Sequence, residues 1–263
     1  MSGSLSFAVG SDGVISVNDD AVYAGPCLLA LASGLSVMAG PGVPAGVAIE
    51  KLRPLDIDGN PSEIGRALSD SFERVGRALY DLIESEPLLH GMATSLTAIL
   101  RHGCNIAISH IGDSRAYILR EYRLSQLTQE HTVARKLLDE GKITHADLVS
   151  DPRASWLTRV IDGSGEVRVD LEIRRAEPGD RYLLCSRSLW KSVPFESIAH
   201  ILSSESTPQK AVDVLIRTAR QRDSRNTVTC VVADFVVGGN APPREPVTAG
   251  AALKQVMWPH ISS

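Results

Sequence analysis

The pattern of apolar and polar residues near the middle of the chain predicts two strands joined by a tight turn. Residues 105–111 alternate between apolar and polar side chains, as in a half-buried strand, and residues 116–119 resume an apolar run. Between them stands Gly112-Asp113-Ser114-Arg115. Glycine tolerates a positive φ and aspartate can bond to its own backbone, so we expect a hairpin here. Asp113 is then either a plain turn residue or a carboxylate held rigidly enough to bind a metal ion.

Apolar residues at helical spacing predict a long amphipathic helix that ends near Pro87. Asn60-Pro61-Ser62-Glu63 has the features of a helix start: a capping side chain, an early proline and an acid in the first turn. A small-residue loop is expected over residues 32–40, and any helix after it should begin no earlier than about Ala45. Shorter helices are expected at 133–138, 144–149, 198–202 and 208–220. The apolar positions of the long helix are Ile64, Leu68, Phe72, Val75, Leu79 and Leu82.

The other predicted elements alternate between strands and helices along the chain. This order favours an α+β layered domain with largely antiparallel sheets. The polar stretch over residues 129–163 is typical of a mobile flap beside a site. We expect one domain over residues 1–237 and a Gly/Pro-containing tail over 238–263. The remaining strands are expected at 5–9, 27–32, 92–100, 123–127, 171–175, 180–185 and 226–237.

Composition and charge narrow the class of protein. A chain of 263 residues with 43% hydrophobic and 22% charged residues can bury a sizeable core. The net charge of −4 argues against nucleic-acid binding. No apolar run approaches the ~20 residues of a membrane span, and the first residues do not have the form of a signal peptide. The four cysteines are scattered and are expected to be reduced, which suggests a cytoplasmic protein.

Several short motifs stand out along the chain: Asn18-Asp19-Asp20-Ala21, Gly91-Met92-Ala93-Thr94-Ser95, His110-Ile111-Gly112-Asp113-Ser114-Arg115, Gln126-Leu127-Thr128 with His131, Pro178-Gly179-Asp180, and Asn226-Thr227-Val228-Thr229. In their order and spacing they resemble the metal-dependent protein Ser/Thr phosphatase family of the 2C type, and its actinobacterial members in particular. The resemblance covers about residues 5 to 237. It implies a fold of two antiparallel β-sheets sandwiched between helix pairs.

The same resemblance implies that the metal site is degenerate. The family uses two Mn²⁺ or Mg²⁺ ions, which activate a water molecule and are held by carboxylates. Here Ser33-Gly34 stands where the family has Asp-Gly with the bridging carboxylate, Arg187 stands in Ser-Asp-Gly-Leu, and Arg225 stands in Asp-Asn-x-Thr. A phosphate-binding arginine before the acidic motif also has no counterpart. Asp223 could supply one ligand through a register slip.

These replacements predict a catalytically inactive protein. Repulsion between a guanidinium group and a divalent ion at ligand distance is several kcal/mol even at an effective dielectric constant of ~20. We therefore expect no binuclear metal centre, no other cofactor and negligible phosphatase activity, which makes the chain a pseudophosphatase. The alternative is an active phosphatase that holds Mn²⁺ or Mg²⁺ with an unusual ligand set.

Three acidic residues, Asp19, Asp20 and Asp113, match family positions that line the metal site. Carboxylates gathered without cations repel each other and raise their own pKa values. Our hypothesis is that Arg187 and Arg225 supply the positive charge and pair with them; otherwise the two arginines turn to solvent.

Arginine can also hold phosphate without a metal ion, so Arg187 and Arg225 are candidate phosphate-binding residues. The expected partners are a phosphoprotein, a Ser/Thr kinase or a paralogous phosphatase in bacterial Ser/Thr signalling. A third possibility is that the flap over residues 129–163 docks onto a kinase or phosphatase instead.

Overall fold

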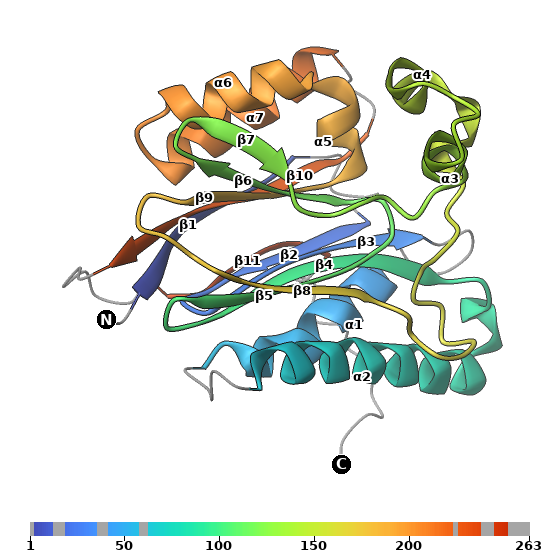
Figure 1. Cartoon of the computed structure of the whole chain (residues 1–263). Coiled ribbons are helices and arrows are strands. Elements are labelled where there is room, and N and C mark those ends of the chain that lie inside the picture. The colour runs from blue at the N-terminus through green and yellow to red at the C-terminus, as the bar shows by residue number, and fades with distance from the viewer. Residues whose placement is uncertain are drawn as a thin grey trace.

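The computed structural model describes residues 3–12, 19–35, 42–57, 63–222, 226–237 and 245–251. Within these ranges two antiparallel sheets lie face to face, and helices cover the outer face of each sheet (Figure 1). This confirms the predicted α+β sandwich. Predictions on Asn18, Asn60, Asp223 and Arg225 fall outside the described residues.

The five-stranded sheet has the strand order β1-β10-β9-β6-β7, and all its neighbours run antiparallel. Three helices, α5, α6 and α7, cover its outer face (Figure 1). The bounds are β1 Gly3–Asp12, β6 Arg115–Arg120, β7 Arg123–Gln126, β9 Arg181–Cys185, β10 Val228–Val237, α5 Arg187–Ser192, α6 Phe195–Ser204 and α7 Pro208–Arg222.

The six-stranded sheet has the strand order β11-β2-β3-β4-β5-β8, again antiparallel throughout. Helices α1 and α2 cover its outer face, while α3 and α4 lie to one side of the sandwich (Figure 1). The bounds are β2 Asp20–Ala24, β3 Leu28–Leu35, β4 Ala93–His102, β5 Asn105–Ile111, β8 Asp170–Arg175, β11 Val247–Gly250, α1 Val43–Leu52, α2 Ile64–Ser85, α3 Val133–Asp139 and α4 His145–Ser150, with short 3₁₀ turns at Arg53–Leu55, Pro87–Leu89 and Pro152–Ser155.

The long helix α2 follows its predicted stripe, because all six apolar positions are buried against the six-stranded sheet. The helix before it begins earlier than expected. α1 starts at Val43 with Pro44 in its first turn, where proline loses no hydrogen bond, so the expected start at Ala45 is wrong. No helix in the described ranges is both long enough and apolar enough to cross a membrane.

The expected small-residue loop begins too early, because β3 continues through Ser33 to Leu35. Small residues are accepted in this strand since β2 and β4 pair with it on both sides. Beyond the expected domain boundary at residue 237, Val247–Gly250 forms β11 and pairs with β2. The sheet therefore uses residues that the sequence placed in the tail.

The predicted central hairpin is wrong. β5 lies in the six-stranded sheet and β6 in the five-stranded sheet, so residues 112–114 carry the chain from one sheet to the other. Gly112 has a φ of 111°, and a Cβ built on it would lie 2.1 Å from the Cβ of Ser95, so only glycine fits this crossing. The Gly-Asp signal marks a sharp turn but does not say whether the flanking strands pair with each other.

Candidate functional site

The inner faces of both sheets change from apolar to polar toward one end of the sandwich. Apolar side chains fill the middle of the space between the sheets. Side chains alternate between the two faces of a strand, so the residue two positions beyond the last inward-facing apolar residue also faces inward. At this end of the rows stand Ser11 on β1, Asp20 on β2, Ser33 on β3, Thr97 on β4, His110 on β5, Ser186 after β9 and Thr229 on β10.

Asp20 is buried among these polar side chains and faces Ser33 in the β2–β3 pair. Burial raises the pKa of Asp20 to about 6, although hydrogen bonds from the Ser33 and Thr229 hydroxyl groups favour its ionised form. The Thr229 hydroxyl also lies 3.1 Å from the Ser11 hydroxyl. The nearby carboxylates of Asp19 and Asp113 also raise the pKa of Asp20. Asp20 therefore has both hydroxyl groups and other acids as neighbours, and one of the hydroxyl groups belongs to Ser33, the residue expected in place of the bridging carboxylate.

Asp19 and Gly34 meet through their backbones. The Gly34 amide donates to the Asp19 carbonyl oxygen at 2.8 Å, just beyond the Asp20–Ser33 pair. The structure therefore brings Asp20, Ser33 and Gly34 together on the neighbouring strands β2 and β3, with Asp19 directly before β2. Sequence reasoning placed all four at the site.

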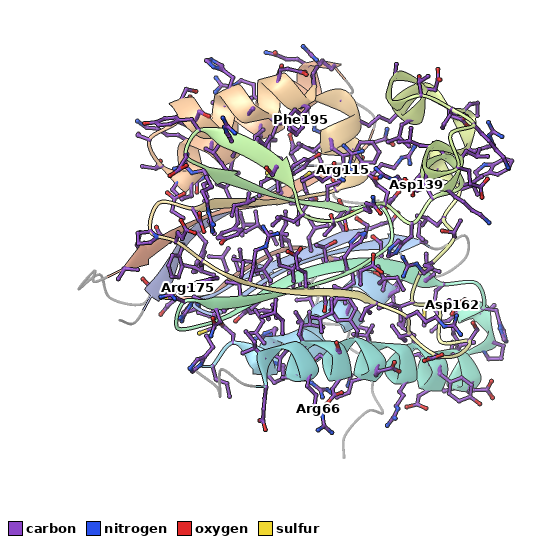
Figure 2. The ribbon with its side chains drawn as sticks, in the orientation of Figure 1. Arg66, Arg115, Asp139, Asp162, Arg175 and Phe195 are labelled. Atoms are coloured by element: carbon purple, nitrogen blue, oxygen red, sulfur yellow. The ribbon has the colours of Figure 1, made fainter. Side chains whose placement is uncertain are left out.

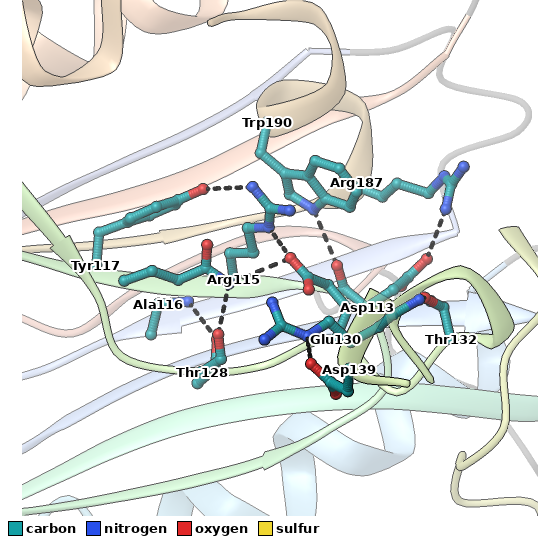
Figure 3. Close-up of polar contacts among 12 residues, drawn as sticks. Asp113, Arg115, Ala116, Tyr117, Thr128, Glu130, Thr132, Asp139, Arg187 and Trp190 are labelled. Atoms are coloured by element: carbon teal, nitrogen blue, oxygen red, sulfur yellow. Dashed lines mark hydrogen bonds and ion pairs between the residues drawn. The ribbon is translucent and has the colours of Figure 1, made fainter. Parts of the chain in front are cut away.

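Asp113 lies in the crossing between the sheets, opposite the first residue of α5. Nη1 of Arg187 is 3.6 Å from Oδ2 of Asp113, which is an ion pair slightly longer than a hydrogen bond (Figure 3). The Arg187 side chain is 23% exposed. Burial raises the pKa of Asp113, and Arg187 opposes this rise without cancelling it. The guanidinium group thus stands beside one of the three expected carboxylates.

A group of side chains behind Arg187 was not predicted. The Arg115 guanidinium lies 3.7 Å from the centre of the Trp190 ring, and Arg187 lies 5.7 Å from the same ring. Trp190 donates through Nε1 to the Asp113 carbonyl oxygen at 2.9 Å. Arg115 also pairs with the buried Glu130 (Figure 3). Trp190 therefore ties α5, and with it Arg187, to the chain crossing.

Two buried histidines hold the crossing from the other side. Nδ1 of His110 lies 2.8 Å from the Thr97 hydroxyl, and Nδ1 of His131 accepts from the Gly112 amide at 3.1 Å. The Nε2–H group of His131 is then left to donate to Asp170 at 3.0 Å. Burial lowers the pKa of His110 to about 3 and also lowers that of His131. His131 therefore supports the Gly112 backbone directly, whereas His110 is held by Thr97 on the neighbouring strand.

The described residues at this end of the sandwich combine carboxylates with neutral and cationic side chains. Hard cations require several oxygen ligands, mostly carboxylates. Here Asp20 has a hydroxyl neighbour and Asp113 has a guanidinium neighbour. In the described ranges no group of three or more His, Cys, Asp or Glu side chains is placed to hold a metal ion. Arg225 and Asp223 lie outside these ranges, so the expected loss of the metal site stays a prediction.

Comparison with known sequences reveals close relatives of this chain. It is 39% identical to the serine/threonine protein phosphatase PstP of Mycobacterium tuberculosis over 249 residues, which is 94% of this chain and 48% of PstP. The chain thus spans about half the length of that curated relative. It is 32% identical to the serine/threonine phosphatase stp of Listeria monocytogenes over 65% of this chain and 68% of that protein. No protein-family model matches the chain.

Solved structures show the same fold. The crystal structure of M. tuberculosis PstP superposes with a TM-score of 0.84 at 38% identity, covering 89% of this chain and 100% of that one. The PstP catalytic domain in complex with two manganese ions gives a TM-score of 0.83 at 37% identity, with the same two coverages. The two stacked sheets, their flanking helices and the acidic positions at one end define a protein phosphatase 2C-like domain. This chain belongs to the PPM-type, or 2C-type, family of protein Ser/Thr phosphatases.

Proposed function

We propose that this family member is a pseudophosphatase, which binds phosphorylated Ser or Thr side chains of a phosphoprotein in its cleft without hydrolysing them. The observation that carries the proposal is the Arg187 guanidinium 3.6 Å from Asp113. The family resemblance places metal ligands at this end of the sandwich. A cation at this position disfavours a divalent ion and favours an anion.

On binding, the phosphate group would replace the Asp113 carboxylate as the partner of Arg187. A phosphate group accepts the parallel N–H groups of arginine in a bidentate manner, which is stronger than a single long contact with a carboxylate. Burial raises the pKa of Asp113 although Arg187 opposes the rise.

The test is a titration with a phosphoserine or phosphothreonine peptide and its unphosphorylated form, followed by calorimetry. The wild-type chain should prefer the phosphorylated peptide, and Arg187→Glu should abolish that preference. The matched control is Arg153→Glu, because Arg153 pairs with Asp151 on the 3₁₀ turn of the flap. Affinity no better than about millimolar for every phosphopeptide would reject binding in the cleft.

The competing function is an active metal-dependent Ser/Thr phosphatase with an atypical ligand set. It is favoured by Asp20 and Asp113, which stay acidic at one end of the sandwich. Metal titration by calorimetry separates the two functions. We expect no Mn²⁺ or Mg²⁺ uptake by the wild type and a gain of Mn²⁺ binding in Ser33→Asp/Arg187→Asp/Arg225→Asp. Two bound Mn²⁺ ions per wild-type chain, with hydrolysis of p-nitrophenyl phosphate, would establish the active enzyme.

A different part of the domain supports docking onto a Ser/Thr kinase or a paralogous phosphatase. The flap has a small core of its own, in which Ala134 and Leu148 are buried against Leu138 and Ile143. Trp156 on the same segment is 60% exposed. Binding to such a partner that persists in Arg187→Glu and is lost in Trp156→Ala would assign recognition to the flap instead of the cleft.

A further inference from the structure

Strand β8 forms an open edge of the six-stranded sheet. In the described part of the chain it pairs with β5 alone. Figure 1 shows β8 running along the near side of the sandwich, and Figure 2 labels Arg175, the last residue of this strand. The side chains of Leu171 and Ile173 lie against Gly65 of α2, yet they stay 43% and 59% exposed. An edge that leaves aliphatic side chains exposed invites pairing with another strand.

The hydrogen-bond pattern shows which residues of β8 face outward. The Ala176 amide donates to the Cys104 carbonyl oxygen at 2.8 Å, so this pair is bonded toward β5. Bonded and non-bonded pairs alternate in an antiparallel ladder. The backbone groups of Leu171, Ile173 and Arg175 therefore point away from β5. In agreement, the Arg175 carbonyl oxygen accepts from a side chain of the other sheet, Nη2 of Arg120, at 3.1 Å.

We propose that this edge pairs with the β8 edge of a second copy of the chain, antiparallel about a two-fold axis at Ile173. The outward backbone groups then bond Ile173 to Ile173 of the second copy, and Leu171 to its Arg175. The pairing continues the six-stranded sheet from one copy into the other. Such an isologous contact is closed, so it gives a dimer and not a fibre.

Charge selects this register. With the axis at Ile173, Glu172 of each copy stands opposite Arg174 of the other, in the non-bonded pairs where side chains approach most closely. A shift that moves the axis to Glu172 would set Glu172 against Glu172, which is repulsive. Within one copy Nε of Arg174 lies 3.0 Å from Oε1 of Glu172, so the two side chains already sit on the same face of the strand. This self-complementary order of charges favours a second copy over an unrelated strand.

The test is sedimentation equilibrium of the whole chain over concentrations that extend through the micromolar range, since a single strand pair makes a small interface. Two facing pairs become repulsive in Glu172→Arg, so the dimer dissociation constant should rise by about ten- to thirtyfold. Glu172→Arg/Arg174→Glu swaps the charges and should restore the dimer. The control Glu166→Arg reverses an exposed charge that pairs with Arg168 before β8, and it should change nothing.

The variant Ile173→Lys places two ammonium groups at the axis and should leave only monomer. A wild-type chain that stays monomeric throughout the series would overturn the proposal. So would a dimer that survives Ile173→Lys, or one that the charge swap fails to restore. Circular dichroism of each variant checks that the fold is kept.

Discussion

Replacement of Arg187 by methionine tests whether the guanidinium group belongs to the cleft. Methionine keeps an unbranched apolar side chain that can lie near Trp190, but it removes the charge that faces Asp113. Asp113 then stays buried without its cationic neighbour. We expect Arg187→Met to destabilise the protein, and Asp113→Asn to relieve much of that loss.

The magnitude follows from the geometry. Two unit charges 3.6 Å apart attract by about 4–5 kcal/mol at an effective dielectric constant of 20. The cost of taking both groups out of water opposes this attraction, and the raised pKa of Asp113 shows that burial outweighs it for the carboxylate. The coupling free energy left between Arg187 and Asp113 should be about 1–3 kcal/mol.

The assay is a double-mutant cycle by urea denaturation at neutral pH, with Arg187→Met, Asp113→Asn and the double variant. The solvent-exposed pair Glu166–Arg168 provides a reference cycle, which should show weak coupling. Equal coupling in the two cycles would refute the pairing. Arg187 would then turn to solvent, and the argument for an anion-binding cleft would lose its main support.

Two further predictions concern the crossing between the sheets. Burial lowers the pKa of His110 from 6.5 to about 3, so its contribution to stability is complete above pH 6.5 and falls as the pH drops toward 3, by ~1.4 kcal/mol per pH unit. His110→Asn should flatten the pH dependence of urea unfolding. Gly112→Ala should cost ~3 kcal/mol, through a positive φ and a clash with Ser95, and Gly141→Ala only ~1 kcal/mol, because nothing lies within 4 Å of its Cβ position. Equal losses of unfolding free energy in the two alanine variants would refute the steric account.

Local patterns predicted most elements but not their partners. The stripe of α2 could be recognised because a helix buries one face at a fixed period. Strand β2 was not predicted, because all five of its residues are buried and it lacks the alternation that marks a half-buried strand. Strand β11 was not predicted, because it is only four residues long and follows a Gly/Pro-rich stretch. The central turn was misassigned because sheet membership depends on contacts between distant segments.

At the site, too, local patterns located individual residues but not the contacts between them. Ser33, Asp113 and Arg187 could be located from short motifs and their order, and the fold brings their strands to one end of the sandwich. The contact of Trp190 with the Asp113 carbonyl joins residues 77 positions apart, and no local pattern signals it. Thr229 had a usable signal, since it continues the inward-facing row of β10.

The two buried acids, Asp20 and Asp113, each have a partner that favours the charged form of the carboxylate. A buried carboxylate needs a cation or hydrogen-bond donors, because an unpaired buried charge is costly. Asp20 has donors in Ser33 and Thr229, and Asp113 has Arg187. Ser33 and Arg187 thus each favour the ionised form of a neighbouring buried carboxylate. Ser33 and Asp20 should therefore be coupled in the free energy of unfolding. Ser33→Ala should destabilise the wild type, and the same change should cost much less when Asp20 is replaced by asparagine.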